Sequence, residues 1–408
     1  MATPRRAVAA VTTARLPMRI LFVAPRFHTN QVEAIRALVA AGHKVWFHAA
    51  TIGPVEDHGP VVPHVHPQAL ASRLLTRLLG FGVNNRWYFP APLSYWREFR
   101  RVAPDVAVVR WHNLLYCWLV GLYARLCGCR VVIYEQISPD LLAAVWSRGF
   151  MGKLRKVRFW LRTRLLKAAW MTPLPGTSPL PANGFFVPFA VPVAASFPPP
   201  ADTPRLLEIG KFVPRKNHLA FVEAVAVVAR DEAVSATIVG ECSSAAHRHT
   251  LDGVRRAIDD RGLRNVAIRC NVPHAGMEAI YGEHDVFVLP ASLEPAAVSP
   301  LEALGRGLPV VVTDDCGTKG YVDEGVTGFV CRAGDVAALA GAIGRAMRLS
   351  REPESRSRIA RIAQRRFSAD AFLAAFGEMS ERRFGIKIDS VREAGVDLAI
   401  TPAQGVST

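Results

Sequence analysis

Residues 286–303 read VFVLPASLEPAAVSPLEA and carry the clearest structural signal in the chain. The uninterrupted apolar run Val286–Leu289 is typical of a strand that is buried on both faces, as in a parallel sheet. A short loop follows, and Ser299-Pro300 then predicts the start of a helix. Ser299 is expected as the N-cap and Pro300 at the first helical position. The stretch therefore predicts a strand, a loop and a helix in direct succession.

The loop and the helix start together predict an anion-binding site. Backbone N–H groups of a first helical turn attract an anion, and the small residues Ala296 and Ala297 would let a phosphate approach the backbone. Glu294 and Glu302 flank this position, and carboxylates accept hydrogen bonds from sugar hydroxyls. A phosphate between two such carboxylates suits a nucleotide-sugar. In the alternative interpretation Glu302 only completes a capping box with Ser299, but Glu294 lies outside the helix.

A second charged loop lies in residues 208–218, which read EIGKFVPRKNH. It follows a predicted strand and leads into a helix, so it is expected at the carboxyl end of the same sheet. Lys211, Arg215 and Lys216 could there neutralise a diphosphate leaving group, whose charge grows in the transition state. The alternative is a solvated basic loop with no function.

Strand and helix patterns alternate along the rest of the chain and predict an α/β fold. Two doubly wound, Rossmann-like domains would face each other across a cleft at the carboxyl ends of their strands. The sequence has neither GxGxxG nor GxxxxGK[ST], which argues against a dehydrogenase or a P-loop enzyme. The expected strands are Ile20–Ala24, Lys44–Ala49, Val106–Val109, Val131–Tyr134, Leu206–Ile209, Ala236–Val239, Val266–Ile268, Val286–Leu289 and Val310–Thr313.

Composition indicates where the domains begin and end. Residues 171–204 are rich in proline and predict a stiff linker. Residues 353–383 predict one long basic helix. No apolar run approaches the roughly 20 residues that span a bilayer. The expected division is an extension at 1–17 that is disordered, an N-terminal acceptor-side domain at 18–190, a Pro-rich linker at 191–204, a donor domain at 205–352, a C-terminal helix at 353–388 and a tail at 389–408.

The net positive charge comes from the first half of the chain. The net charge is +16, and residues 1–190 hold 24 lysines and arginines against 7 acidic residues. Met151–Lys167 and Leu70–Phe81 interleave basic residues with leucines at helical spacing. We interpret this basic face as one that meets an anionic membrane or an acidic acceptor. The alternative is that both helices cover the sheet with their leucines buried. No nucleic-acid-binding motif is present, and the seven cysteines have no metal-like spacing.

At these motifs the chain resembles the retaining GT-B glycosyltransferases of the "group 1" family (family four). The resemblance covers residues 19–385 in organisation and is sharpest across 205–331. The family's Glu-x7-Glu motif corresponds to Glu294 and Glu302. Its Gly-Arg-Leu…Lys-Gly segment corresponds to Gly210-Lys211-Phe212…Lys216-Asn217. Asp285 and the segment 307–311 also match.

The resemblance implies sugar transfer from a nucleotide-sugar to a saccharide or lipid-linked acceptor, with retained configuration. It implies no metal, no cofactor and no protein nucleophile. Synthesis of a cell-surface polysaccharide or glycolipid is expected, in the cytoplasm and peripherally on the inner face of the membrane. A GT-B nucleotide-sugar epimerase and an inert binding subunit are the alternatives. The implied roles are diphosphate contacts for Lys211 and Lys216, donor-sugar contacts for Glu294, ribose contacts for Glu302, and further donor contacts for Gly210, Arg215, Ala297, Val298 and Ser299.

The chain departs from the family pattern mainly on the acceptor side. The first loop, residues 25–31, lacks the common glycines, and Tyr134-Glu135-Gln136 stands where many relatives carry a histidine. After Glu-Pro the family often has Phe-Gly-Leu, whereas this chain has Ala296-Ala297-Val298. The candidate acceptor-side residues are His28, Asn30, His112 and Glu135, with simple packing as the alternative role of His112.

Overall fold

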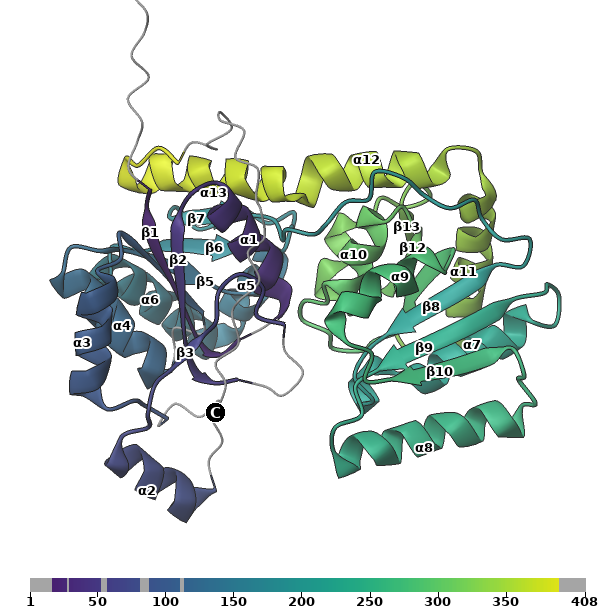
Figure 1. Ribbon diagram of the computed structural model, residues 1–408, viewed down its shortest axis with the longest axis horizontal. Helices are drawn as coiled ribbons and strands as arrows, with labels where there is room; N and C mark the ends of the chain where they lie inside the picture. Colours follow the sequence, from purple (N-terminus) through teal and green to yellow (C-terminus); the bar gives the residue numbers. More distant parts are fainter. Residues whose placement is uncertain (1–16, 28, 53–56, 81–87, 111–113, 389–408) are drawn as a thin grey trace, which may run out of the picture.

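The structure, a computed structural model, describes residues 17–27, 29–52, 57–80, 88–110 and 114–388. Two sheets of parallel strands lie side by side, each covered by helices (Figure 1). The predicted α/β class with two doubly wound domains is therefore confirmed. The predictions for residues 1–16 and for the tail 389–408 lie outside the described residues.

The first sheet has the strand order β3-β2-β1-β4-β5-β6-β7. Buried apolar residues fill both of its faces, which is why its strands read as apolar runs. Its strands are β1 (Arg19–Arg26), β2 (Lys44–Thr51), β3 (His64–Val65), β4 (Val106–Arg110), β5 (Arg130–Tyr134), β6 (Ala169–Thr172) and β7 (Gly184–Phe186). Its helices are η1 (Thr29–Gln31), α1 (Val32–Ala40), α2 (Leu70–Leu79), α3 (Pro92–Val102), α4 (Leu115–Leu126), α5 (Pro139–Ser147) and α6 (Gly149–Leu165).

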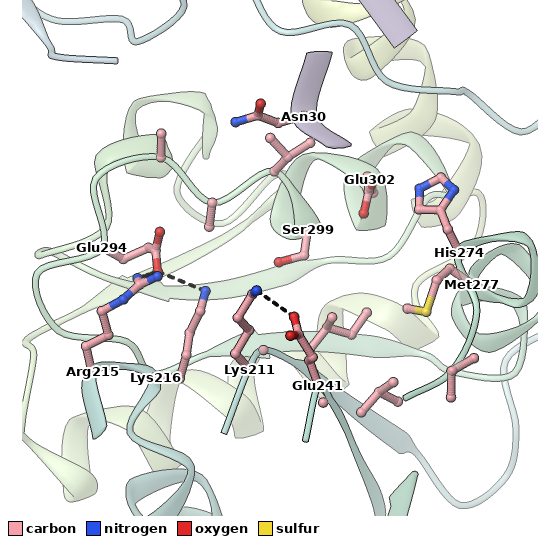
Figure 2. A pocket seen from close by; sticks show the side chains of 18 of the residues that line it. Asn30, Lys211, Arg215, Lys216, Glu241, His274, Met277, Glu294, Ser299 and Glu302 are labelled. Carbon is pink, nitrogen blue, oxygen red and sulfur yellow. Dashed lines mark hydrogen bonds and ion pairs between the residues drawn. The ribbon is translucent and has the colours of Figure 1, made fainter. Parts of the chain in front are cut away.

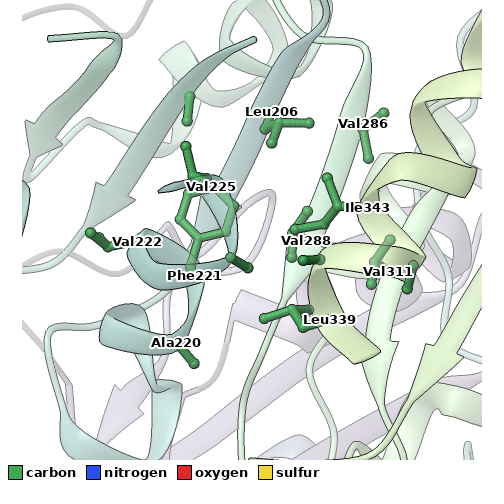
Figure 3. Close-up of a cluster of buried hydrophobic side chains, with 14 of the residues drawn as sticks. Leu206, Ala220, Phe221, Val222, Val225, Val286, Val288, Val311, Leu339 and Ile343 are labelled. Atoms are coloured by element: carbon green, nitrogen blue, oxygen red, sulfur yellow. The ribbon is translucent and has the colours of Figure 1, made fainter. Parts of the chain in front are cut away.

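The second sheet has the order β10-β9-β8-β11-β12-β13. One of its two cores packs the strands against α7 and α11 (Figure 3). Its strands are β8 (Arg205–Ile209), β9 (Ser235–Gly240), β10 (Val266–Cys270), β11 (Val286–Leu289), β12 (Val310–Thr313) and β13 (Gly328–Cys331). Its helices are η2 (Pro214–Lys216), α7 (His218–Val228), α8 (Ala245–Asp260), η3 (His274–Gly276), α9 (Met277–Gly282), α10 (Ser299–Gly305), η4 (Gly317–Tyr321) and α11 (Val336–Arg351).

The predicted single helix at the C-terminus is wrong, because the segment forms two helices. α12 (Ser355–Phe367) stops before Ser368, whose backbone is extended at ψ 175°. The Ser368 hydroxyl then accepts the Ala371 N–H at the start of α13 (Ala369–Phe384). Phe367 packs in the second domain, whereas Phe376 is buried in the core of the first. The two helices therefore run from one domain back to the other (Figure 1).

The Pro-rich stretch is only partly a connection between the domains. Its first part forms the end of β6 and all of β7, which add two parallel strands to the first sheet. Residues 187–204 contain no helix or strand, and the Val191 N–H donates to the Phe367 carbonyl at 3.0 Å. The connection thus lies beside the end of α12.

Candidate donor-binding site

A cavity of about 420 Å³ lies at the carboxyl ends of the second sheet. Parallel strands place their following loops at one edge, so loops distant in the sequence meet there. Asn30 of the first domain closes one side. The structure brings together the predicted residues Asn30, Gly210, Lys211, Arg215, Lys216, Glu294, Ala297, Val298, Ser299 and Glu302, all of which line the cavity (Figure 2).

The loop after β8 positions two lysines through close backbone packing. A Cβ on Gly210 would lie 3.0 Å from the Lys216 side chain, so glycine leaves room for that lysine to cross the loop. A Cβ on Gly240 would lie 2.5 Å from the Gly210 carbonyl oxygen. Asn217 ends η2 in the left-handed conformation at φ 57° and begins α7. Lys216 is therefore buried and directed across the cavity wall.

Glu294 is held by two cations. Its side chain is 7% exposed, Lys216 Nζ lies 2.9 Å from its Oε2, and Arg215 pairs with the same oxygen. Its backbone carbonyl accepts the Gly317 N–H at 2.8 Å, which ties the loop after β11 to η4. The preceding Leu293 has φ 51°, a conformation that is rare for a residue with a side chain. Backbone and side-chain contacts together fix this carboxylate at the cavity edge.

Lys211 pairs with a carboxylate that the motifs did not indicate. Its Nζ lies 2.5 Å from Glu241 Oε2, just after β9 (Figure 2). Partial burial acts to raise the pKa of Glu241, but the hydrogen bonds from Lys211 and Ser243 together with the charge of Lys211 outweigh it, and the net pKa is lowered. The position of Glu241 directly after a strand was the available sequence signal.

Glu302 does not act as a helix cap. α10 begins at Ser299 with Val298 as the N-cap residue, so the predicted N-cap role of Ser299 is wrong. The Glu302 carboxylate instead accepts the Tyr281 hydroxyl at 2.6 Å. Burial and the neighbouring Glu302 raise the pKa of Tyr281 well above its ordinary value, so the phenol stays a donor. The Arg306 guanidinium lies 4.8 Å from the centre of the Tyr281 ring and supports it.

One wall of the cavity thus carries three cations paired with Glu241 and Glu294, and a third carboxylate, Glu302, lies apart from them. Lys211, Arg215 and Lys216 gather along one side, and Glu302 lies across from them near His274 (Figure 2). The cations can neutralise phosphate oxygens, while the carboxylate can accept hydroxyl hydrogen bonds. The lining also includes Asn271, His274 and Met277, which follow β10 and which sequence reasoning missed.

The first domain contributes a neighbouring cavity of about 490 Å³ that shares Glu294 and Arg215. The buried Arg110, at the end of β4, donates to Gln136 Oε1 at 2.7 Å. Glu135 lines this cavity and accepts the Trp170 indole N–H at 3.1 Å. Asn30 lines both cavities. The other two acceptor-side candidates, His28 and His112, lie outside the described residues.

Solved structures with the same arrangement identify the class of fold. A glycosyltransferase from Rickettsia africae is similar over 90% of this chain and 98% of its own, with a TM-score of 0.66 and 13% identity. HepE from Anabaena in complex with UDP-glucose is similar over 90% of this chain and 100% of the HepE chain, with a TM-score of 0.64 and 14% identity. The chain therefore has the GT-B fold of glycosyltransferases.

Sequence comparison adds similarity to a family and to two relatives. Residues 194–366 match the family described as "Glycosyl transferases group 1". The chain is 29% identical over 148 residues to the lipopolysaccharide core biosynthesis glycosyltransferase LpsE of Rhizobium meliloti, covering 35% of this chain and 39% of the relative. It is 30% identical over 183 residues to a glycogen synthase of Mycobacterium tuberculosis, covering 43% and 42%. The chain thus spans about two fifths of the length of these relatives.

Proposed function

We propose that the protein transfers a sugar, with retained configuration, from a nucleotide-sugar to a saccharide or lipid-linked acceptor in the synthesis of a cell-surface polysaccharide or glycolipid. The observation that carries the proposal is the cavity in which the Glu294–Lys216 pair and Glu302 face the same space. The family match, the likeness to HepE with UDP-glucose and the likeness to LpsE support it.

Each charged group has a distinct role in the proposed reaction. Lys211 and Lys216 stabilise the departing diphosphate as its negative charge grows. Glu294 accepts hydrogen bonds from the donor sugar, and Glu302 accepts them from the ribose. The bond from the anomeric carbon to the phosphate oxygen breaks while the acceptor oxygen bonds to the same face. The departing phosphate accepts the acceptor's proton, so no protein nucleophile is needed.

Donor binding and turnover test this function together. Nucleotide-sugars are screened by thermal shift, because a donor at a hundred times its Kd stabilises the fold by about 2.7 kcal/mol. The stabilising donor is then incubated with and without oligosaccharides, and nucleoside diphosphate and products are measured. A glycoside product supports transfer. An isomerised nucleotide-sugar without acceptor would indicate an epimerase, and binding without any turnover would indicate an inert binding subunit.

We also propose that the reaction needs no metal ion, because lysines can supply the positive charge at the diphosphate. Full activity in excess EDTA is the expected result. Loss of activity in EDTA that magnesium or manganese restores would contradict this part of the proposal.

The outer helices of the first domain support docking on an anionic membrane. No helix in the described ranges is long and apolar enough to span a bilayer. On α6, however, Val157, Leu161 and Leu165 are exposed rather than buried against the sheet, and so are Leu70 and Leu78 on α2. Exposed leucines between basic residues fit a lipid surface, where each Lys or Arg near the membrane contributes about 1 kcal/mol.

Sedimentation with vesicles tests the docking. The protein should pellet with phosphatidylserine vesicles at low salt and release at high salt. Replacing Lys153, Arg155 and Arg158 by Glu should prevent pelleting, because these side chains are exposed. A matched control replaces Arg248, Arg256 and Arg264 of the second domain by Glu and should still pellet. Absence of wild-type pelleting at low salt would rule out the surface.

A further inference from the structure

A third cavity, of about 680 Å³, is also lined by the loop that carries Glu294. Both domains line it, through the segment after β5, the segment after β6 and the loop after β12. Glu294 and Pro295 line both this cavity and the 490 Å³ cavity of the first domain. Glu294 also lines the 420 Å³ cavity proposed for the donor. A group bound here would therefore lie beside Glu294, as would a donor in the 420 Å³ cavity.

The walls of this cavity combine apolar and polar groups, as ligand sites do. Leu141 and Leu293 are 52% and 79% exposed, and both border the cavity. Gln136, Ser138 and Thr177 add neutral polar groups from the first domain. Such a lining can contact the apolar faces of a sugar ring and hydrogen-bond its hydroxyls.

The backbone around this cavity is closely packed, so its shape is fixed. A Cβ on Gly317 would lie 1.8 Å from the Pro295 carbonyl oxygen, and one on Gly320 would lie 2.8 Å from Pro175 of the first domain. The Tyr321 hydroxyl donates to the Pro173 carbonyl, a second link between the domains. Because the Gly317 N–H also donates to the Glu294 carbonyl, the wall of this cavity and the backbone of Glu294 are held together.

The charges on the lining determine which ligands fit. Asp140, Asp314 and Asp315 border the cavity, and Lys319 is the one cation among the described residues of its lining. The fourth carboxylate, Glu294, is already paired with Arg215 and Lys216. The Lys319 ammonium already donates to the Asp314 carbonyl at 2.5 Å. Hydrogen bonds from Ser178 and Thr177 lower the pKa of Asp140 to about 2, so it stays ionised. An anionic ligand would be repelled, whereas hydroxyl groups would find acceptors.

We propose that this cavity is an acceptor subsite that binds an uncharged, hydroxyl-rich saccharide and excludes anionic sugars. The proposal rests on the glycosyl transfer proposed above and specifies the chemical class of its acceptor. It also separates two functions of the first domain. The basic outer helices attract an anionic surface, while the acidic cavity selects the neutral sugar that enters the cleft.

Steady-state assays on a cavity-filling variant test the subsite. Nucleoside diphosphate release is measured from the stabilising donor alone, then with neutral maltotriose, cellotriose or mannotriose, and with trigalacturonic acid. A neutral trisaccharide should stimulate release and trigalacturonic acid should not. Leu141→Trp should lower the stimulated kcat/KM at least tenfold while leaving the release without acceptor within twofold. Leu126→Trp, at an exposed leucine of α4 outside the lining, should behave as wild type.

A charge reversal adds a second readout. Asp315→Lys removes one negative charge and adds a positive one, so trigalacturonic acid should begin to stimulate release. Stimulation of the wild type by trigalacturonic acid, full stimulation of Leu141→Trp, or no response to any neutral trisaccharide would each overturn the subsite. Failure of the proposed function looks different, because no nucleotide-sugar would then be turned over by any variant.

Discussion

Asp285 and Glu294 are buried carboxylates at opposite ends of one strand, β11, and each binds two cations. Asp285, 1% exposed, pairs with Arg205 at 2.9 Å and Arg356 at 2.6 Å. Glu294, 7% exposed, pairs with Lys216 and Arg215. Asp285 precedes the strand and lines none of the described cavities around the site, whereas Glu294 follows the strand and borders three. Burial and ion pairing alone thus do not identify a site; the carboxyl edge of the sheet does.

The largest effect is expected from Asp285→Ala, and it should be a loss of stability. Removing one partner of a buried ion pair leaves an uncompensated charge and costs about 3–5 kcal/mol. Here Arg356 is the buried partner, and it also donates to the His284 carbonyl at 2.8 Å. Denaturant unfolding should show the loss, while the KM for donor in the folded fraction stays unchanged. Glu378→Ala, which breaks an exposed pair with Arg382, should cost at most about 1 kcal/mol.

The pH dependence of this difference follows from the pKa of Asp285. Burial acts to raise that pKa, but the hydrogen bonds from Arg205 and the charges of Arg205 and Arg356 together outweigh it, and the net pKa is lowered. A lowered folded-state pKa stabilises the fold above the unfolded pKa, and this stability is lost as pH falls through the folded pKa. The difference in unfolding free energy between the wild type and Asp285→Ala should therefore become smaller at acidic pH. An equal gap at neutral and acidic pH would contradict the ionised pair.

Glu294→Ala should produce the opposite pattern. We expect kcat/KM to fall about a hundredfold, which corresponds to roughly 2.7 kcal/mol of transition-state stabilisation. Stability should fall less than in Asp285→Ala, because Arg215 is half exposed and the buried Lys216 adjoins an open cavity. Kinetics and unfolding are measured on the same preparation. A variant that loses stability but keeps its activity would place Glu294 with Asp285 as a structural residue.

The sequence predicted the second domain better than the first for a physical reason. The candidate site residues Lys216 and Glu294 lie in loops that follow apolar strands, and a parallel sheet brings such loops together. Glu302's partner Tyr281 lies inside a short helix, where a tyrosine reads as packing. The crossing of α13 to the first domain could not be predicted, because helical periodicity shows an apolar face but not the sheet that it covers.

The first domain gave weaker predictions because its loops do not match the family pattern. Arg110 ends a strand as an apparently ordinary charged residue, yet it is buried and bonded to Gln136 beside the cleft. The exposure of the leucines on α2 and α6 could not be predicted either. Their helical spacing fits a face on the sheet and a face on a membrane equally well.

Two further variants, Lys216→Ala and Glu302→Ala, test whether the 420 Å³ cavity binds the nucleotide-sugar donor. Each should lower kcat/KM at least about tenfold, roughly 1.4 kcal/mol, through lost contacts to the diphosphate and to the ribose respectively. Inhibition by a free nucleoside diphosphate should weaken in both. By contrast, a free nucleoside should lose affinity only for Glu302→Ala, because it carries ribose but no phosphate. Near-wild-type kinetics in either folded variant would remove that residue from the donor site.

The smallest effect concerns a third buried carboxylate, Glu208, which lies beneath the loop of Lys211 and Lys216. Its Oε1 lies 2.8 Å from His218 Nδ1, and His218 Nε2 lies 3.0 Å from the Lys211 carbonyl. Both ring nitrogens thus lie close to oxygen atoms, an arrangement that favours a doubly protonated imidazolium. Burial acts to lower the pKa of His218, but the contacts with Glu208 and the Lys211 carbonyl together outweigh it, and the net pKa is raised.

Glu208→Gln should therefore change the pH profile of activity more than its maximum. Because the folded-state pKa is raised, the charged His218 ring supports the loop at low pH. This support is lost as the pH rises through that pKa. Without Glu208 the pKa of His218 falls, so the alkaline decline of kcat/KM should begin at a lower pH than in the wild type. At pH values below this decline, kcat/KM should be only severalfold lower than in the wild type. Glu223→Gln, which breaks a surface pair with Arg261, should leave the profile unchanged. An unshifted profile in Glu208→Gln would mean that His218 is not charged in the active enzyme and that the loop is held by packing alone.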